Sequence, residues 1–247
     1  MHALVRWRRC GVMIALLAAG CSAAAASRSK GVDASFFPLT PLSRWEYVVQ
    51  QRGRSATFRF VATVNPDDFR SEDGRTCRVV DERYADVSEE ERFPIVYCNE
   101  GGYLHRVMSL EYRAGVLADN GLRSGELKFL PTDLEPAQTW EGHTNAYRLP
   151  DGSGFDVRQL HHVSPSREQV VVPAGAFARC MRVETTAIHS AIDVEGRPVG
   201  PRVVYYYSDW YAPGVGLVKT EQRDEGASVL ATIELVSYAI GRDPVAR

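Results

Sequence analysis

Three cysteines within the body of the chain have the type and spacing for covalent chemistry, namely Cys77, Cys98 and Cys180. If residues 75 to 100 form one hairpin with its tip near Val87-Ser88, antiparallel pairing sets Cys77 directly opposite Cys98. Directly opposed residues have Cβ atoms roughly 4.5 to 5.5 Å apart, which is close to the range of a disulfide. We therefore predict a Cys77–Cys98 disulfide in an oxidising compartment and a free Cys180.

The common motifs of enzymes and of metal or nucleotide sites do not occur in the sequence. It contains no P-loop, no G-x-G-x-x-G, no H-E-x-x-H, no G-x-S-x-G and no C-x-x-C. His161 and His162 are the single adjacent histidine pair, but neighbours on a strand point to opposite faces and do not chelate one metal together. We expect no metal, no cofactor and no catalytic residues. An envelope hydrolase is the less favoured alternative.

A short apolar segment at the N-terminus leads to another cysteine, Cys21. Three arginines stand before the segment: Arg6, Arg8 and Arg9. The uncharged run from Cys10 to Gly20 has 11 residues, whereas a membrane-spanning helix needs about 20. Residues 1–20 are therefore predicted to be a signal peptide.

Ala18-Ala19-Gly20-Cys21 resembles the lipobox of bacterial lipoproteins. The resemblance implies a diacylglyceryl group and an amide-linked acyl chain, such as palmitate, on Cys21. Two or more chains anchor a protein stably, where one chain does not. Ser22 in place of aspartate favours the outer membrane, facing the periplasm, and residues 21–35 read as a flexible tether. The alternative is ordinary cleavage after Ala24 or Ala26, which would discard Cys21.

Composition and patterning indicate one β domain over residues 36–241. The chain has 247 residues with 29 basic and 31 acidic side chains, and no basic patch suggests nucleic acid as a partner. Alternation such as "FRFVATV" at 58–64 recurs between turn signals such as Asp151-Gly152. We predict an all-β fold, a curved antiparallel sheet or open barrel of about ten to twelve strands. A short helix is considered at 116–124 or 86–92.

The domain shows signs of an internal duplication, with possible repeats at 36–130 and 131–241. The spacing of Leu39, Pro41 and Trp45 recurs 95 residues later in Leu134, Pro136 and Trp140. Two weaker anchors follow in the same order, one of which aligns Cys77 with Cys180. A symmetric second hairpin around Glu195-Gly196 then sets Cys180 opposite Tyr211, so we expect Cys180 to be a buried free thiol.

The stretch "VVYYYSDWY" at 203–211 makes both faces of one strand aromatic. Tyr205 and Tyr207 share one face, and Tyr206 and Trp210 share the other. One face fills the core, and the other either is covered by protein or meets a ligand or partner. The candidate ligand or partner surface is therefore Tyr205, Tyr206, Tyr207, Trp210 and Tyr211.

Three motifs resemble those of a large family of bacterial exported proteins and lipoproteins. They are Phe37-Pro38-Leu39 through Trp45 to Tyr47, then Val172-Pro173-Ala174-Gly175-Ala176-Phe177, and then Trp210-Tyr211-Ala212-Pro213-Gly214-Val215-Gly216-Leu217-Val218-Lys219. The corresponding signatures are P-A-G-x-F and W-Y-A-x-G-V-G-x-V-K. More loosely, the chain is similar to the β half-barrels of the lipoprotein-carrier class, which hold acyl chains, a likeness of fold only.

Two functions remain open at this stage. The first is a non-enzymatic, lipid-anchored envelope lipoprotein whose curved sheet binds an apolar ligand or a lipidated partner. The second is a scaffold or interaction protein of an outer-membrane complex. A lined hollow in the sheet would favour the first, and a flat exposed aromatic patch would favour the second.

Overall fold

The fold is a single antiparallel sheet of twelve strands, seen in a computed structural model that describes residues 36–71, 74–85, 92–113, 116–148 and 153–241. The strands are β1 (Arg44–Gln51), β2 (Phe58–Arg70), β3 (Thr76–Tyr84), β4 (Arg92–Glu100), β5 (Tyr103–Arg113), β6 (Val116–Pro131), β7 (Thr139–Arg148), β8 (Gly154–Val172), β9 (Gly175–Ile192), β10 (Val203–Ala212), β11 (Gly216–Arg223) and β12 (Val229–Ala239). The all-β prediction and its strand number are confirmed. Within the described residues, no helix is long and apolar enough to cross a membrane.

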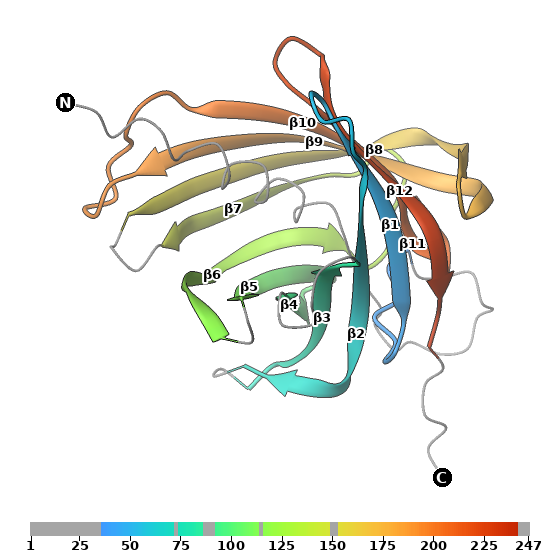
Figure 1. Cartoon of the computed structure of the whole chain (residues 1–247), viewed down its shortest axis with the longest axis horizontal. Helices are drawn as coiled ribbons and strands as arrows, with labels where there is room; N and C mark the ends of the chain where they lie inside the picture. Colours follow the sequence, from blue (N-terminus) through green and yellow to red (C-terminus); the bar gives the residue numbers. More distant parts are fainter. Residues whose placement is uncertain (1–35, 72–73, 86–91, 114–115, 149–152, 242–247) are drawn as a thin grey trace.

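The sheet curls into a nearly closed barrel (Figure 1). Its strand order is β6-β5-β4-β3-β2-β1-β12-β11-β10-β9-β8-β7, so the first and last strands pair in the middle and β6 and β7 form the two edges. The edges approach each other closely, because the Trp140 indole on β7 donates a hydrogen bond to the Phe129 carbonyl on β6 at 3.2 Å. A Cβ on Gly142 would lie 2.7 Å from the Lys128 carbonyl oxygen, so glycine permits this approach.

The helix considered at 116–124 does not form, because these residues belong to β6. Leu117 pairs with Tyr112 and Leu122 with Leu110, so cross-strand pairing with β5 decides the local structure. Of the other segment, 86–92, residues 86–91 lie outside the described part of the chain.

The first duplication anchor has a matching backbone geometry in both halves of the chain. Leu42 and Ala137 are 95 residues apart, and both adopt a positive φ, of 65° and 61°. The Leu42 amide donates to the Val64 carbonyl at 3.0 Å, and the Ala137 amide donates to the Val163 carbonyl at 3.1 Å. Six strands, β1 to β6, lie between the two turns, and six more, β7 to β12, follow the second turn. The internal duplication itself stays a prediction.

Cys77 and Cys98 form a disulfide between β3 and β4. They pair directly in the register expected from the sequence. The bridge closes a separation of 21 residues, which corresponds to roughly 3 kcal/mol of stabilisation in the chain-entropy model. It packs with Val96 in a small cluster separate from the main core.

Cys180 is free and fully buried, as expected, but its predicted partner across the hairpin is wrong. Met181, not Cys180, pairs with Tyr211. The connection between β9 and β10 is asymmetric, because Pro198 bridges back to Ile192 before Gly200 takes a φ of 78°. This asymmetry shifts the register by one residue. Burial raises the pKa of the Cys180 thiol to about 11.

Candidate functional site

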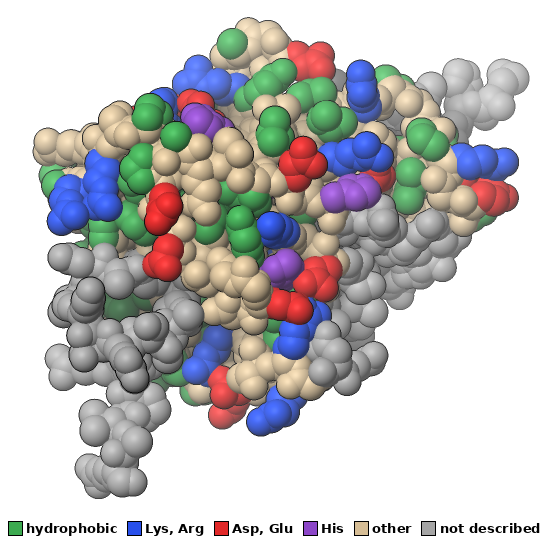
Figure 2. All heavy atoms as spheres, turned by 180° about the vertical axis from the view of Figure 1, so that it is seen from behind, with side chains coloured by type: hydrophobic (Ala, Val, Ile, Leu, Met, Phe, Trp, Pro, Cys, Tyr) green, Lys and Arg blue, Asp and Glu red, His purple; other side chains and the backbone are tan. Residues whose placement is uncertain are grey.

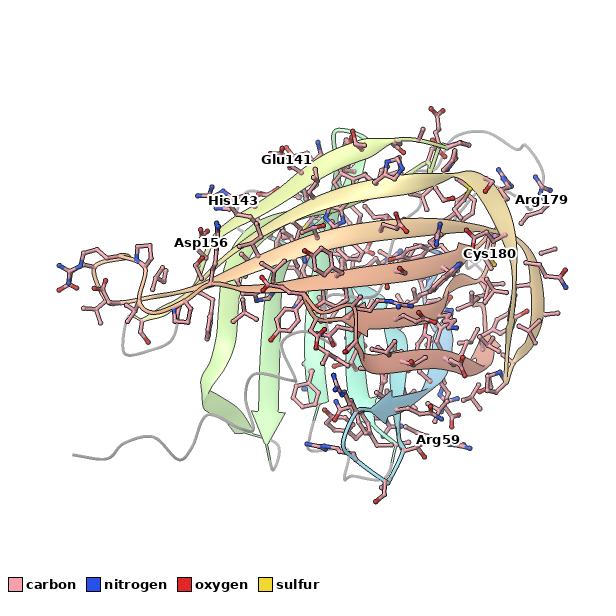
Figure 3. The ribbon with its side chains drawn as sticks, turned by 90° about the horizontal axis from the view of Figure 1, so that it is seen from above. Arg59, Glu141, His143, Asp156, Arg179 and Cys180 are labelled. Atoms are coloured by element: carbon pink, nitrogen blue, oxygen red, sulfur yellow. A yellow bond between two sulfur atoms is a disulfide. The ribbon has the colours of Figure 1, made fainter. Side chains whose placement is uncertain are left out.

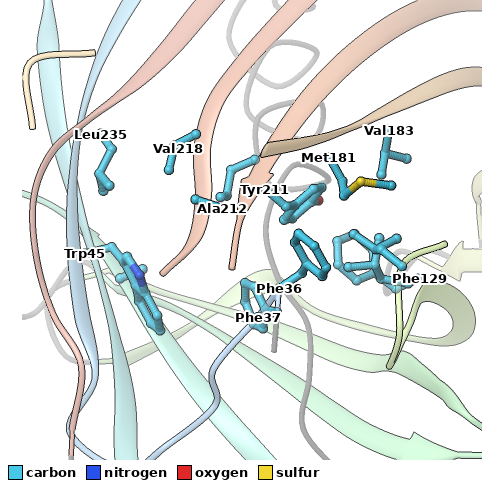
Figure 4. Packing of buried hydrophobic residues seen from close by; sticks show 14 of the residues in the cluster. Phe36, Phe37, Trp45, Phe129, Met181, Val183, Tyr211, Ala212, Val218 and Leu235 are labelled. Atoms are coloured by element: carbon cyan, nitrogen blue, oxygen red, sulfur yellow. The ribbon is translucent and has the colours of Figure 1, made fainter. Parts of the chain in front are cut away.

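One end of the barrel, called the capped end here, is filled by a cluster of large apolar side chains. It is the end at which β1 begins and at which β8 turns into β9 and β10 into β11. Figure 4 shows Phe37, Trp45, Tyr211 and Leu235 gathered there from segments far apart in the chain. Phe37 stacks on Trp45 with ring centroids 5.9 Å apart, so the segment before β1 plugs this end.

The three family-like motifs meet at the capped end. The Trp45 indole donates to the Val215 carbonyl at 2.6 Å, and the Tyr47 hydroxyl donates to the Leu217 carbonyl at 3.1 Å. Gly216 has a φ of 105°, which favours glycine, and a Cβ there would be 3.5 Å from the Trp45 Nε1 atom. These motifs therefore build a structural cap.

The turn between β8 and β9 completes the cap. Val170 and Val172 are buried in the main core, and the Ala174 amide donates to the Leu235 carbonyl of β12 at 2.9 Å. The guanidinium of Arg167 lies 5.8 Å from the ring centroid of Phe36. The long strands β8 and β9 therefore carry their turn across the end of the barrel, as Figure 3 shows on the side of Arg179 and Cys180.

The middle of the barrel interior carries buried polar side chains on β8 to β11. His161 Nδ1 and the Thr185 hydroxyl lie 2.8 Å apart. The Thr220 hydroxyl donates to the Asp209 carboxylate at 2.6 Å. The Trp140 ring stacks on the His161 imidazole with centroids 4.6 Å apart. Polar side chains at inward-facing positions of these strands thus form a hydrogen-bonded layer inside the barrel. This layer is called the polar layer below.

A small cavity of about 10 Å³ adjoins this polar layer. Its walls are Phe129, Leu130, Gln159, His161, Val183, Thr185, Tyr207, Asp209 and Tyr211. Two buried polar atoms next to it, His161 Nε2 and Gln159 Oε1, have no hydrogen-bond partner among the described residues. The volume of this cavity is about that of a single water molecule, which is too small for an acyl chain.

Burial shifts the protonation equilibria of the interior groups. Desolvation lowers the pKa of His161 to about 3, so its imidazole is neutral, and raises the pKa of Asp209 to about 7 against the hydrogen bond from Thr220. Desolvation also raises the pKa of Glu82 to about 8, although the charge of Arg106 opposes the shift. Near pH 6, burial therefore favours the neutral forms of His161, Asp209 and Glu82.

We predict that Asp209→Asn changes how stability depends on pH. Because the folded pKa of Asp209 lies above its ordinary value of 3.8, its contribution favours the folded state below about pH 4. That contribution is lost as the pH rises through about 7, so wild type should lose up to a few kcal/mol relative to the variant between pH 4 and 8. Urea unfolding at pH 5 and pH 8 measures the difference.

The matched control is Glu195→Gln, which replaces an exposed carboxylate in the β9–β10 turn by its amide. It is expected to leave the pH profile of stability close to that of wild type. Glu82, His161 and His189 titrate in both wild type and the Asp209 variant, so their effects cancel in the comparison. Parallel profiles for wild type and Asp209→Asn would contradict the raised pKa.

Toward the end opposite the cap, the inner face of the barrel is aromatic. On β2 to β4, Phe58 and Phe93 both pack edge-on against Tyr84, with centroids 5.4 and 5.7 Å apart. On β9 and β10, His189 packs against Tyr205 at 5.4 Å. Phe58, Tyr84 and Tyr205 are only partly buried, so aromatic surface on the inner face stays accessible at this end.

The predicted aromatic surface divides as strand parity requires. Tyr205, Tyr207 and Tyr211 lie on the inner face, where Tyr207 and Tyr211 are buried and line the cavity. Tyr206 lies on the outer face and is 41% exposed. Trp210 also lies outside, half-buried, and its indole donates to Glu168 at 2.8 Å.

The remaining predicted site residues are the cysteines. Cys77 and Cys98 lie away from the interior cavity, and Cys21 lies outside the described residues. Among the residues that are described, no group of three or more His, Cys, Asp or Glu side chains could hold a metal ion. The histidine pair points as expected, with His161 buried inside and His162 exposed outside.

Sequence reasoning missed the interior polar layer, most clearly Asp209, Thr185 and Thr220. A signal was present, because Asp209 alternates with Tyr207 and Tyr211 and must share their face. The buried pair of Glu82 on β3 and Arg106 on β5 left no comparable sign in the sequence, since the two residues belong to strands that are not neighbours in the sheet.

Among the solved structures that this chain resembles are two bacterial proteins. One is a candidate lipoprotein from Parabacteroides distasonis ATCC 8503, with 14% identity and a TM-score of 0.47, covering 84% of this chain and 99% of that chain. The other is a candidate exported protein with a YmcC-like fold from Bacteroides fragilis NCTC 9343, with 16% identity and a TM-score of 0.45, covering 83% and 99%. No protein-family model matches the chain, and no curated protein is similar to it in sequence.

Proposed function

We propose that this protein is a non-enzymatic, lipid-anchored envelope lipoprotein that binds an apolar ligand, or the acyl chain of a lipidated partner, at the uncapped end of its barrel. The observation that carries the proposal is the accessible aromatic inner face formed by Phe58, Tyr84 and Tyr205. Ligand sites for apolar molecules are concave surfaces lined mostly by aromatic and aliphatic side chains. The signal peptide and the lipobox resemblance at Cys21 support the envelope location.

The layered interior supports binding at this end rather than along the whole barrel. The cap fills one end with buried side chains such as Phe37 and Trp45. The cavity beside the polar layer at His161 and Asp209 has a volume of about 10 Å³. A chain that enters past Tyr205 would therefore meet aromatic rings first and the polar layer at its tip. An acyl chain would then lie against the aromatic rings, and the polar layer would limit how deeply its apolar end enters.

A second function is favoured by the outer face of the same strands. Leu160 on β8 is 53% exposed and Tyr206 on β10 is 41% exposed. Both pair with Thr186 on the strand between them, so they lie in one row across the sheet. An exposed row of this kind suits a protein partner in an outer-membrane complex.

One crosslinking experiment separates the two functions. A photoreactive phenylalanine analogue replaces Tyr205 in one variant and its neighbour Tyr206 in a matched control, in cells that make the full chain. Because adjacent strand residues point to opposite faces, the two probes sample the inner and outer surfaces at almost the same position along the barrel. Irradiation is followed by mass analysis of the purified protein.

We expect a lipid or acyl-peptide adduct on the Tyr205 variant and none of that mass on the Tyr206 variant. A protein adduct on the Tyr206 variant without any adduct at Tyr205 would support the scaffold function instead. Absence of an apolar adduct at Tyr205 in the folded, exported protein would contradict the ligand proposal.

A further inference from the structure

The turn between β8 and β9 presents an unusual amount of apolar surface to solvent. The nine residues from Val170 to Ala178 carry no charge. Val171 is 71% exposed, the largest exposed fraction among the exposed large hydrophobic side chains. Pro173, Ala176 and Ala178 are exposed as well. This segment is called the apolar tip below.

The apolar tip is held in place by its other face. Val170 and Val172 are buried in the main core, so Val171 between them must point away from the barrel. Val171 pairs with Ala176 and Val172 with Gly175, and the Ala174 amide bonds to β12. These main-chain hydrogen bonds within the hairpin and to β12 fix the tip in place, and each of them lowers the free-energy cost of placing the tip in a medium with little water.

More apolar and basic side chains are exposed at the capped end. Tyr238 is 43% exposed, and its ring centroid lies 5.9 Å from that of Phe177 in the tip. Leu42, at the turn before β1, is 64% exposed. Arg167 and Arg179 flank the tip on its two strands and are exposed. Apolar residues bordered by arginines are typical of protein surfaces that rest in a lipid head-group layer.

The tether leads to this same end of the molecule. The chain enters the described structure at Phe36, directly beneath Arg167 of β8. The 14 residues between Cys21 and Phe36 are residues 22 to 35. Fully extended, they reach at most about 50 Å, so an acylated Cys21 keeps the capped end within that distance of the membrane.

We infer that the capped end docks on the phospholipid membrane, with the apolar tip at the boundary between head groups and acyl chains. The inference rests on the proposed acylation of Cys21 and adds to it the orientation of the domain. The apolar tip, and not the β6–β7 turn at the same end, is the segment that contacts the membrane. The β6–β7 turn exposes the acidic residues Asp133 and Glu135, which do not suit contact with lipid. The aromatic end of the barrel then points away from the lipid surface, where it is free to receive a ligand.

The test uses the full chain, isolated with its lipid and placed in vesicles of phosphatidylethanolamine and phosphatidylglycerol. An environment-sensitive fluorophore is attached to Val171→Cys in the tip or to Val199→Cys in the β9–β10 turn at the opposite end. Val199 is a matched control, because it is also an exposed valine, at 51%. In the processed, acylated protein the native thiols do not compete, since Cys77 and Cys98 are bridged, Cys180 is buried and the Cys21 sulfur carries the proposed lipid. In protein without the acyl group, peptide mapping separates label on residue 171 from label on Cys21.

We expect a blue shift and quenching by brominated lipids for the probe at residue 171, and neither effect at residue 199. The mass of the N-terminal peptide reports the acylation of Cys21 separately. An acylated protein whose residue 171 probe stays aqueous would overturn the orientation while leaving the proposed anchor intact. A protein without the acyl group whose residue 171 probe stays aqueous would overturn both.

Discussion

Replacing Trp45 with alanine should lower the free energy of unfolding by roughly 3–5 kcal/mol, the range for deleting a large aromatic side chain from a core. Trp45 is 1% exposed and stacks on Phe37 within the cap. Its removal would also leave the Val215 carbonyl, which accepts the indole hydrogen bond, without that partner. Urea unfolding followed by far-ultraviolet circular dichroism, with the disulfide intact, measures the loss.

The control is the same substitution at Trp210. That side chain is half-buried on the outer face, and its indole bonds to the Glu168 carboxylate. Because Trp210 packs against the main core but keeps part of its ring in solvent, Trp210→Ala is expected to cost less than Trp45→Ala. Equal losses at the two positions would show that the cap does not contribute the stability assigned to it.

The strands were predictable because apolar and polar residues alternate along each strand, and because residue pairs such as Asp151-Gly152 mark the turns between them. The hairpin of β3 and β4 is the clearest case, since symmetric pairing alone sets Cys77 opposite Cys98. The same construction failed by one residue at Cys180, because the β9–β10 connection is asymmetric and no residue pattern announces that asymmetry. A slip of one residue changes every partner along a strand, which is why register is the least transferable part of such a prediction.

The packing of side chains inside the barrel was harder to predict than the strands that enclose it. Parity assigns Asp209 to the face of Tyr207, but parity does not tell whether that face is packed tightly or hollow. That depends on how far β8 and β9 extend and on where their turn comes to rest. The bond from the Ala174 amide to the Leu235 carbonyl joins segments about 60 residues apart in sequence, and such long-range contacts have no local signature.

Three features that lie far apart in the sequence come together at the capped end. The family-like motifs meet there, the chain enters there at Phe36, and the apolar tip is exposed there. The glycines at 175 and 216, with φ values of 129° and 105°, shape the turns that permit this convergence. A single structural unit thus explains why these motifs are spaced so widely along the chain.

Replacing Cys21 with alanine should abolish membrane anchoring through lipid, since the Cys21 sulfur is the proposed attachment point. Without the thiol no diacylglyceryl group is transferred, and the chain either keeps its signal peptide or is released into the soluble fraction. Cys10→Ala is a matched control, because it removes a thiol from the same apolar segment but leaves the lipobox-like sequence unchanged. Labelling with radioactive palmitate and cell fractionation report the two consequences.

Ser22→Asp extends the test from attachment to destination. The resemblance to lipoproteins implies that aspartate after the modified cysteine favours retention in the inner membrane, so this variant should keep its palmitate label and move out of the outer-membrane fraction. Loss of label in Cys21→Ala together with a changed fraction in Ser22→Asp would support both the anchor and the outer-membrane location. Unchanged labelling and fractionation of Cys21→Ala would mean that cleavage occurs beyond Cys21, after Ala24 or Ala26, and that contact with the membrane, if any, depends on the folded domain alone.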